Sequence, residues 1–254
     1  MTIKVIALNT FKEAIRDRIL YLLLFFAALS ILFSRVLAFL TVGDRTKIIK
    51  DVGLASISLF GALMAILIGT GLVTKEIEKR TIFTLISKPL RRHDFLLGKF
   101  FGLVLTLFVM LAGMTIIFLA LLFFYTWTIE WRMLAAIFLI FIELVLITAV
   151  AIFFSCFSTP ILSSLFSLAF YLIGHFAWSL DTLLKKIPTG PARTALRVLY
   201  LLLPRLENFN IKTEVVHGLP VARSLFFAST AYGIVYTAFV LGLAVLIFRR
   251  RDFT

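Results

Sequence analysis

The chain has 254 residues, of which 61% are hydrophobic and only 15% are charged, and its formal net charge is +13. Soluble domains are close to half apolar and about a quarter charged, so this composition excludes an ordinary soluble fold and predicts an integral membrane protein. The basic residues cluster beside apolar runs, which favours the positive-inside pattern and anionic lipid as a partner over nucleic acid.

Residues 1–18 alternate apolar and charged side chains at helical spacing. We expect an interfacial elbow helix here that lies flat with its apolar side in lipid. A signal peptide is the alternative, but the apolar run that follows is too long for one and lacks a small-residue cleavage site. The elbow helix is therefore expected to be retained on the cytoplasmic side.

Six apolar runs follow, and a transmembrane helix needs about 20 residues. The predicted spans are 19–40, 52–74, 95–125, 133–154, 160–180 and 224–248. A polar connection, 41–51, separates the first two spans, and Pro160 begins the fifth after a short uncharged turn. The predicted fold class is an all-α polytopic membrane protein with six transmembrane helices.

The long outer segment, residues 181–223, is broken by four prolines. Within it, residues 192–203 are apolar but too few to cross a bilayer, so we expect short re-entrant or interfacial helices there.

A compact charged stretch, residues 69–99, lies between the second and third spans and holds 7 of the 26 lysines and arginines. Its helical spacing predicts a short helix over residues 75–87, which Pro89 ends. Asp94 is expected to cap the next helix, beginning at Phe95. We call residues 75–94 the charged segment. An ordinary solvated connection is the alternative interpretation.

The residue order in this stretch, Glu78-Lys-Arg-Thr81, Lys88-Pro-Leu-Arg91 and Leu97-Gly-Lys99, resembles that of ABC-2 type transporter permeases. The resemblance is closest to the permeases of multicopper-enzyme and nitrous-oxide-reductase maturation systems, and it covers nearly the whole chain in the order and spacing of spans. In that family the segment is a cytoplasmic coupling helix that docks onto an ATPase subunit. The resemblance implies ATPase contacts at Glu76, Glu78, Lys79, Arg80, Thr81, Lys88, Pro89, Arg91 and Arg92.

A weaker patch, residues 203–210, resembles the stretch where short helices cover the exit of the family's pathway. It implies an outer gate segment with Pro204, Glu207 and Phe209. The family also implies two copies of an ABC ATPase subunit, a second permease copy or homologue, and a periplasmic partner. A role in periplasmic copper-enzyme maturation is suggested, although related permeases export peptides, antibiotics and lipids.

No G-x-x-x-x-G-K-[ST] motif occurs, so we expect no cofactor in this chain, with ATP and Mg bound by the partner ATPase. A membrane-embedded enzyme would need a nucleophile with a base, or metal ligands, at helical spacing. One cysteine, and three histidines assigned to different sides or loops, provide neither, so no catalytic or metal residue is predicted. A non-transporting anchor subunit stays open, because the charged segment alone could serve it.

Glu143 is the one acidic residue between residues 133 and 180, about eleven residues into its span. A charged carboxylate facing lipid at that depth costs on the order of 3 kcal/mol, so we expect it to face the bundle or a dimer interface. It is either a polar point on the translocation path or a protonated carboxyl that holds packing.

Orientation follows from the positive-inside rule. Fourteen lysines and arginines lie before the first span, in residues 75–99 and in the tail, against eleven in the remaining connections. Both termini are therefore predicted to be cytoplasmic. The resemblance to the permease family implies a bacterial plasma membrane.

Overall fold

The structure is a computed structural model that describes residues 2–40, 44–78, 92–128, 130–176 and 204–250. These residues form helices and no strand, which confirms the predicted all-α polytopic fold class. The helices are α1 (Thr2–Ile15), α2 (Arg18–Leu40), α3 (Arg45–Glu78), α5 (Arg92–Thr126), α6 (Arg132–Ser155), α7 (Pro160–His175), η1 (Leu206–Phe209), α10 (Lys212–Val216) and α11 (Arg223–Arg250).

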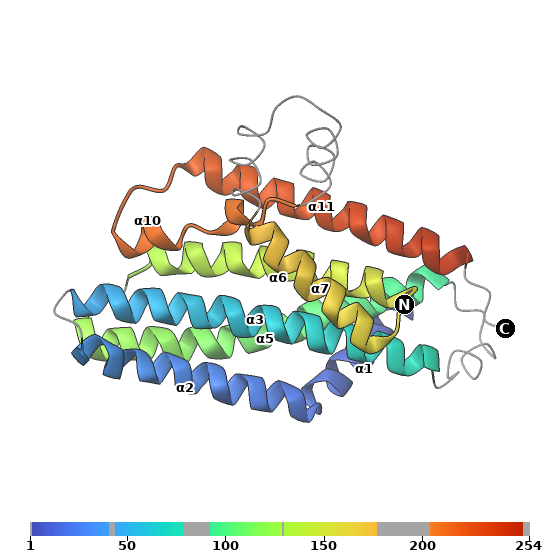
Figure 1. Cartoon of the computed structure of the whole chain (residues 1–254), viewed down its shortest axis with the longest axis horizontal. Coiled ribbons are helices and arrows are strands. Elements are labelled where there is room, and N and C mark those ends of the chain that lie inside the picture. Colours follow the sequence, from blue (N-terminus) through green and yellow to red (C-terminus); the bar gives the residue numbers. More distant parts are fainter. Residues whose placement is uncertain (1, 41–43, 79–91, 129, 177–203, 251–254) are drawn as a thin grey trace, which may run out of the picture.

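Five helices, α2, α3, α5, α6 and α11, are long and apolar enough to cross a membrane, and they run side by side along the long axis (Figure 1). α1 and the C-terminal end of α11 lie at one end of this bundle. We call it the inner end, after the predicted orientation. α10 and the beginning of α6 lie at the opposite, outer end (Figure 1).

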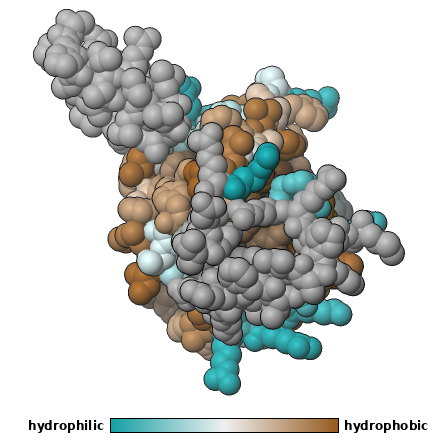
Figure 2. Space-filling view, turned by 90° about the vertical axis from the view of Figure 1, so that its right-hand side faces the viewer, coloured by the Kyte–Doolittle hydropathy of each residue, from teal (hydrophilic) through white to brown (hydrophobic). Residues whose placement is uncertain are grey.

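α3 and α6 form the centre of the bundle. In their most apolar stretches 67% and 72% of residues are buried, against 28% in α2 and α5 and 33% in α11. The three helices at the perimeter, α2, α5 and α11, expose large apolar side chains such as Phe25, Phe108 and Phe239. Figure 2 looks onto the inner end and shows apolar residues on the flanks, with hydrophilic side chains toward the rim. Burial of this kind fits a bundle whose perimeter faces lipid.

α3 extends beyond the predicted span 52–74 at both ends. Residues 45–51 of the expected polar connection 41–51 are helical, and Asp44 caps them: its Oδ1 accepts the N–H of Thr46 at 3.1 Å. At the inner end the helix continues to Glu78 without a break. The beginning of the predicted coupling helix is therefore part of α3.

α5 begins at Arg92, three residues before the predicted start at Phe95. Asp94 is thus not the N-cap but a residue of the first turn, where its carboxylate still suits the positive end of the helix dipole. Its Oδ1 lies 3.4 Å from Nε2 of His93.

α7 is shorter than its predicted span, 160–180. It begins at Pro160 as expected, with Thr159 extended before it, but it ends at His175 after 16 residues. Such a helix is about 24 Å long, shorter than the hydrocarbon core of a bilayer. Residues 177–203, including the apolar run 192–203, lie outside the described residues.

α1 packs against the inner half of α5 rather than only on lipid. Cβ atoms built at Gly98 and Gly102 would lie 2.7 Å from Ile6 and 2.6 Å from the backbone oxygen of Ala7, so small residues permit this close contact. Thr10 is fully buried on the same side. The side of α1 with Thr10 and Ala14 is therefore buried in protein, whereas Val5 and Leu8 are exposed and can face lipid.

Lys99 reinforces the contact between α1 and α5. Its side chain is almost completely buried, and Nζ lies 3.5 Å from Oε2 of Glu13 on α1. A buried ammonium needs such a partner, because removal from water without one is costly.

Candidate functional site

Glu143 lies on α6 with only 2% of its side chain exposed, about 16 Å along the helix axis from Arg132. Its Oε1 is 2.7 Å from Nε2 of His175 on α7. The carboxyl group faces the bundle interior, as expected from the cost of placing it in lipid. Its partner was not predicted.

Polar groups from several helices surround this pair. The ring of Tyr171 packs edge-on against His175, with the centroids 4.6 Å apart, and its hydroxyl interacts with Ser58 on α3. Lys212 on α10 is close enough to be influenced by the charges of Glu143 and Asp51. Burial lowers the pKa of Lys212 below its ordinary value of 10.5, whereas these two carboxylates raise it.

The Glu143–His175 contact joins α6 to α7 inside the bundle through one short hydrogen bond. Removing one partner would leave the other polar group buried without its hydrogen bond, which is costly. The pair is thus a hydrogen-bonded polar point within an apolar bundle.

The predicted outer gate segment includes η1, which packs against α6 and α7, the two helices that carry this pair. Pro204 and Phe209 are buried, whereas Glu207 is exposed and faces away from the bundle. Leu206 lies against Gly174, where a Cβ would be 2.7 Å from its side chain. The hydroxyl of Ser229 on α11 donates to the carbonyl of Asn208 at 2.8 Å. η1 therefore ties the end of α7 to α11.

The predicted ATPase contacts fall largely outside the described residues. Glu76 and Glu78 belong to the last turn of α3 and Arg92 begins α5, but their side chains are not described. The other predicted contacts, Lys79, Arg80, Thr81, Lys88, Pro89 and Arg91, lie in the undescribed stretch 79–91. What the structure provides is the two helices that lead into and out of this stretch.

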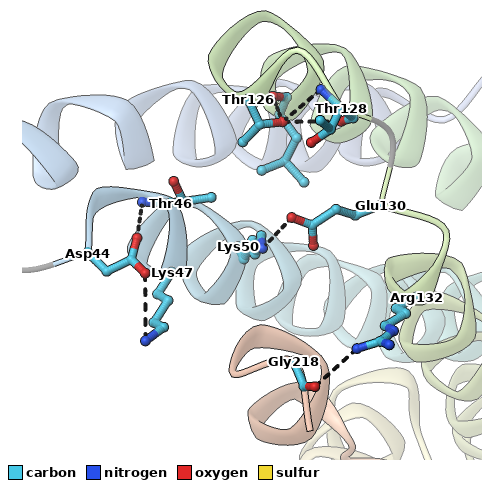
Figure 3. Close-up of polar contacts among 10 residues, drawn as sticks. Asp44, Thr46, Lys47, Lys50, Thr126, Thr128, Glu130, Arg132 and Gly218 are labelled. Atoms are coloured by element: carbon cyan, nitrogen blue, oxygen red, sulfur yellow. Dashed lines mark hydrogen bonds and ion pairs between the residues drawn. The ribbon is translucent and has the colours of Figure 1, made fainter. Parts of the chain in front are cut away.

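An open cleft of about 730 Å³ lies at the outer end and was missed by sequence reasoning. It is lined by the beginning of α3, by residues 130–132 before and within α6, and by residues 215–218 at the end of α10 and directly after it. Lys50 and Glu130 form an ion pair at 2.5 Å, and Nη1 of Arg132 donates to the carbonyl of Gly218 at 3.0 Å (Figure 3). Polar bonds thus join the three parts of the chain that surround the cleft.

One signal in the sequence could have identified His175. Ser163, Ser167, Tyr171 and His175 recur every four residues, which places them on one face of a helix. The first three are buried against the bundle. A polar stripe of this kind along an apolar helix indicates a face that packs on protein, and Glu143 is the acidic residue of the preceding helix.

Comparison with known proteins covers nearly the whole chain. The model of a family described as ABC-2 family transporter protein matches residues 4–253, which include all five long helices. No curated protein matches the chain. Since the match extends across the fold and is not confined to one segment, the chain belongs to the ABC-2 family of transporter proteins and is a multi-pass membrane permease.

Proposed function

We propose that this permease couples ATP hydrolysis by a separate ATPase subunit to movement of a substrate across the membrane, and that the charged segment, residues 75–94, is the contact with that subunit. The family implies an ABC ATPase partner. The observation that carries the coupling proposal is the continuity of the two helices that flank the segment.

α3 has 34 residues and α5 has 35, so each extends about 50 Å without a break. α3 ends within the charged segment and α5 begins within it. Both helices also reach the outer end, where α3 provides Lys47 and Lys50 to the cleft. The two helices also pack against each other. Packed helices move as rigid elements, so a displacement at the inner end would be carried to the outer cleft.

Reversing two charges in the segment tests this contact. Glu78→Lys with Arg80→Glu leaves the net charge unchanged but places like charges against the ATPase, so we expect about tenfold less ATPase to co-purify. Single reversals should have small effects, because exposed ion pairs contribute about 0 to 1 kcal/mol. Co-purification and the ATPase rate of the assembled complex are the measurements.

The matched control is Arg251→Asp with Asp252→Arg, which also preserves net charge on the predicted cytoplasmic side. It should leave assembly unchanged. Normal assembly and ATPase rate with the Glu78 and Arg80 reversal would mean that the subunit docks elsewhere. The alternative of an anchor subunit that does not transport predicts a different result for the unmodified chain. The complex would assemble, but the permease would neither stimulate ATP turnover nor move a substrate.

Labelling of single introduced cysteines tests the proposed orientation. Cys156 is buried, so it should react slowly. Cysteines at Lys47 and His217 should react with an impermeant maleimide added outside, and those at Arg92 and Arg251 only after the membrane is opened. Lys212 is a poor position because its side chain is only partly exposed. Labelling of His217→Cys from the cytoplasmic side alone would rule out the proposed topology.

We further propose, from the resemblance to maturation permeases, that the complex contains two ATPase subunits and a second permease copy or homologue, and that it serves maturation of a periplasmic copper enzyme in a bacterial plasma membrane. Deleting the permease should then lower the copper content of that enzyme while its abundance stays normal. A fully metallated enzyme in the deletion strain would contradict this assignment.

A further inference from the structure

The outer cleft carries a positive charge that its own carboxylates do not balance. Asp44 lies 3.6 Å from Lys47 and also caps α3, and Glu130 is paired with Lys50. Both carboxylates that line the cleft are therefore engaged by a lysine. Arg132 provides a third cation, and within the described part of the chain no carboxylate lies within ion-pair distance of its guanidinium.

Arg132 is well placed to bind a ligand. One of its nitrogens, Nη1, donates to the carbonyl of Gly218, which fixes the side chain at the cleft wall (Figure 3). A guanidinium has five N–H donors, so most remain for another acceptor. Lys47 is half-exposed at the same cleft, and its ammonium has three donors, so the contact with Asp44 at 3.6 Å leaves donors for a ligand.

The rest of the cleft lining mixes polar residues, Thr46 and His217, with apolar ones, and it lies at the level expected for a membrane interface. Trp131, with 70% of its surface exposed, lines the cleft together with Val215 and Val216. Trp127, also largely exposed, lies four residues earlier. Exposed tryptophans concentrate at the depth of lipid headgroups. A ligand of this cleft would therefore meet cations and apolar surface together, beside the headgroup layer.

We propose that the outer cleft binds a phosphate-bearing anion, with Arg132 and Lys47 contacting the phosphate oxygens. Guanidinium and ammonium groups are the usual protein partners of phosphate, and charge-assisted hydrogen bonds of this type are strong. The phosphate can come from the headgroup of an outer-leaflet anionic lipid or from free phosphate. The inference concerns the outer face of the chain alone and does not depend on coupling to an ATPase.

Lipid retention by the purified full-length chain in detergent tests the site. Phosphatidylglycerol and phosphatidylcholine with identical acyl chains are added separately, and bound lipid is counted by native mass spectrometry. We expect phosphatidylglycerol to be retained preferentially, and Arg132→Gln to bind it about tenfold more weakly. Binding should also weaken as salt rises, because both cations are partly exposed.

Inorganic phosphate distinguishes the two sources. If millimolar phosphate displaces phosphatidylglycerol, the cleft recognises the phosphate group itself and free phosphate is also a ligand. If it does not, the lipid is the ligand. Either result supports the site, provided that the variants lose binding.

Two further variants keep the test decisive. Arg132→Gln removes the hydrogen bond to Gly218, so it could also disturb the fold. Lys47→Gln is therefore measured as well, because Lys47 is half-exposed and pairs with Asp44, three residues earlier. Arg223→Gln, an exposed arginine at the outer end of α11 that does not line the cleft, should bind lipid normally. Equal retention of both lipids by the parent chain, or unchanged binding in both Arg132→Gln and Lys47→Gln, would overturn the proposal.

Discussion

Replacing Glu143 with leucine is expected to lower the free energy of unfolding by about 3–5 kcal/mol, the usual cost of breaking a buried charged or polar pair by removing one partner. The reason is the 2.7 Å contact between the buried Glu143 carboxyl group and Nε2 of His175, a hydrogen bond that leucine cannot make. For a chain of this size, such a loss lowers the melting temperature by about 10 °C. Thermal unfolding of the purified permease measures it.

A double-mutant cycle identifies the pair as the cause. Glu143→Leu combined with His175→Leu removes both polar groups, so the double variant should be more stable than Glu143→Leu alone. If the two substitutions simply add, the destabilisation arises from packing and the pair is not its source.

Glu143→Gln then separates a structural role from a role in transport. Glutamine keeps the shape and can hydrogen-bond His175, but it cannot carry a negative charge or exchange a proton at neutral pH. A stable Glu143→Gln permease that no longer transports would place the charge in the transport mechanism. Normal transport and ATPase activity in Glu143→Gln, beside an unstable Glu143→Leu, would make Glu143 structural.

The sequence predicts the burial of Glu143 but not its partner, because the two residues are far apart along the chain. The burial of Glu143 follows from its position alone, because a carboxyl group in the middle of an apolar run cannot face lipid cheaply. Its partner His175 is 32 residues away on a neighbouring helix, and helical spacing does not specify which faces of two helices meet. Lys212 was less predictable still, since it belongs to a five-residue helix in a proline-rich segment.

The second large effect is expected at the contact between α1 and α5. Gly102→Leu places a branched side chain where a Cβ alone would lie 2.6 Å from the backbone oxygen of Ala7, so α1 must move away. Overpacking of this type costs about 1–3 kcal/mol, and here the neighbouring atom is backbone and cannot rotate aside. We expect a lower melting temperature and faster proteolysis near residues 15–17, measured on the purified chain.

Gly113→Leu is the matched control on the same helix. A Cβ at Gly113 meets no atom within 4 Å in the described structure, so the substitution should leave stability nearly unchanged. Equal destabilisation by both changes would mean that leucine disturbs α5 itself. In that case close packing with α1 would not be the explanation.

Hydropathy predicted that the five long helices exist but not where they begin and end. An apolar run ends where charged residues begin, whereas a helix ends where its backbone is capped or broken. α3 therefore starts seven residues before its predicted span, because Asp44 caps a charged first turn at Arg45. Hydropathy predicts the part of a helix in contact with lipid, and the cap decides the rest.

The packing around the inner end of α5 has a consequence for measurements on the working transporter. α1 lies along Gly98 and Gly102, and Phe95 stacks on Phe248 near the end of α11, with ring centroids 6.1 Å apart. The first and last helices therefore both pack against the same part of α5 and should move with it. A distance measured by spectroscopy between labels on α1 and α11 would then stay constant when α5 moves. A distance from either helix to α7 would change.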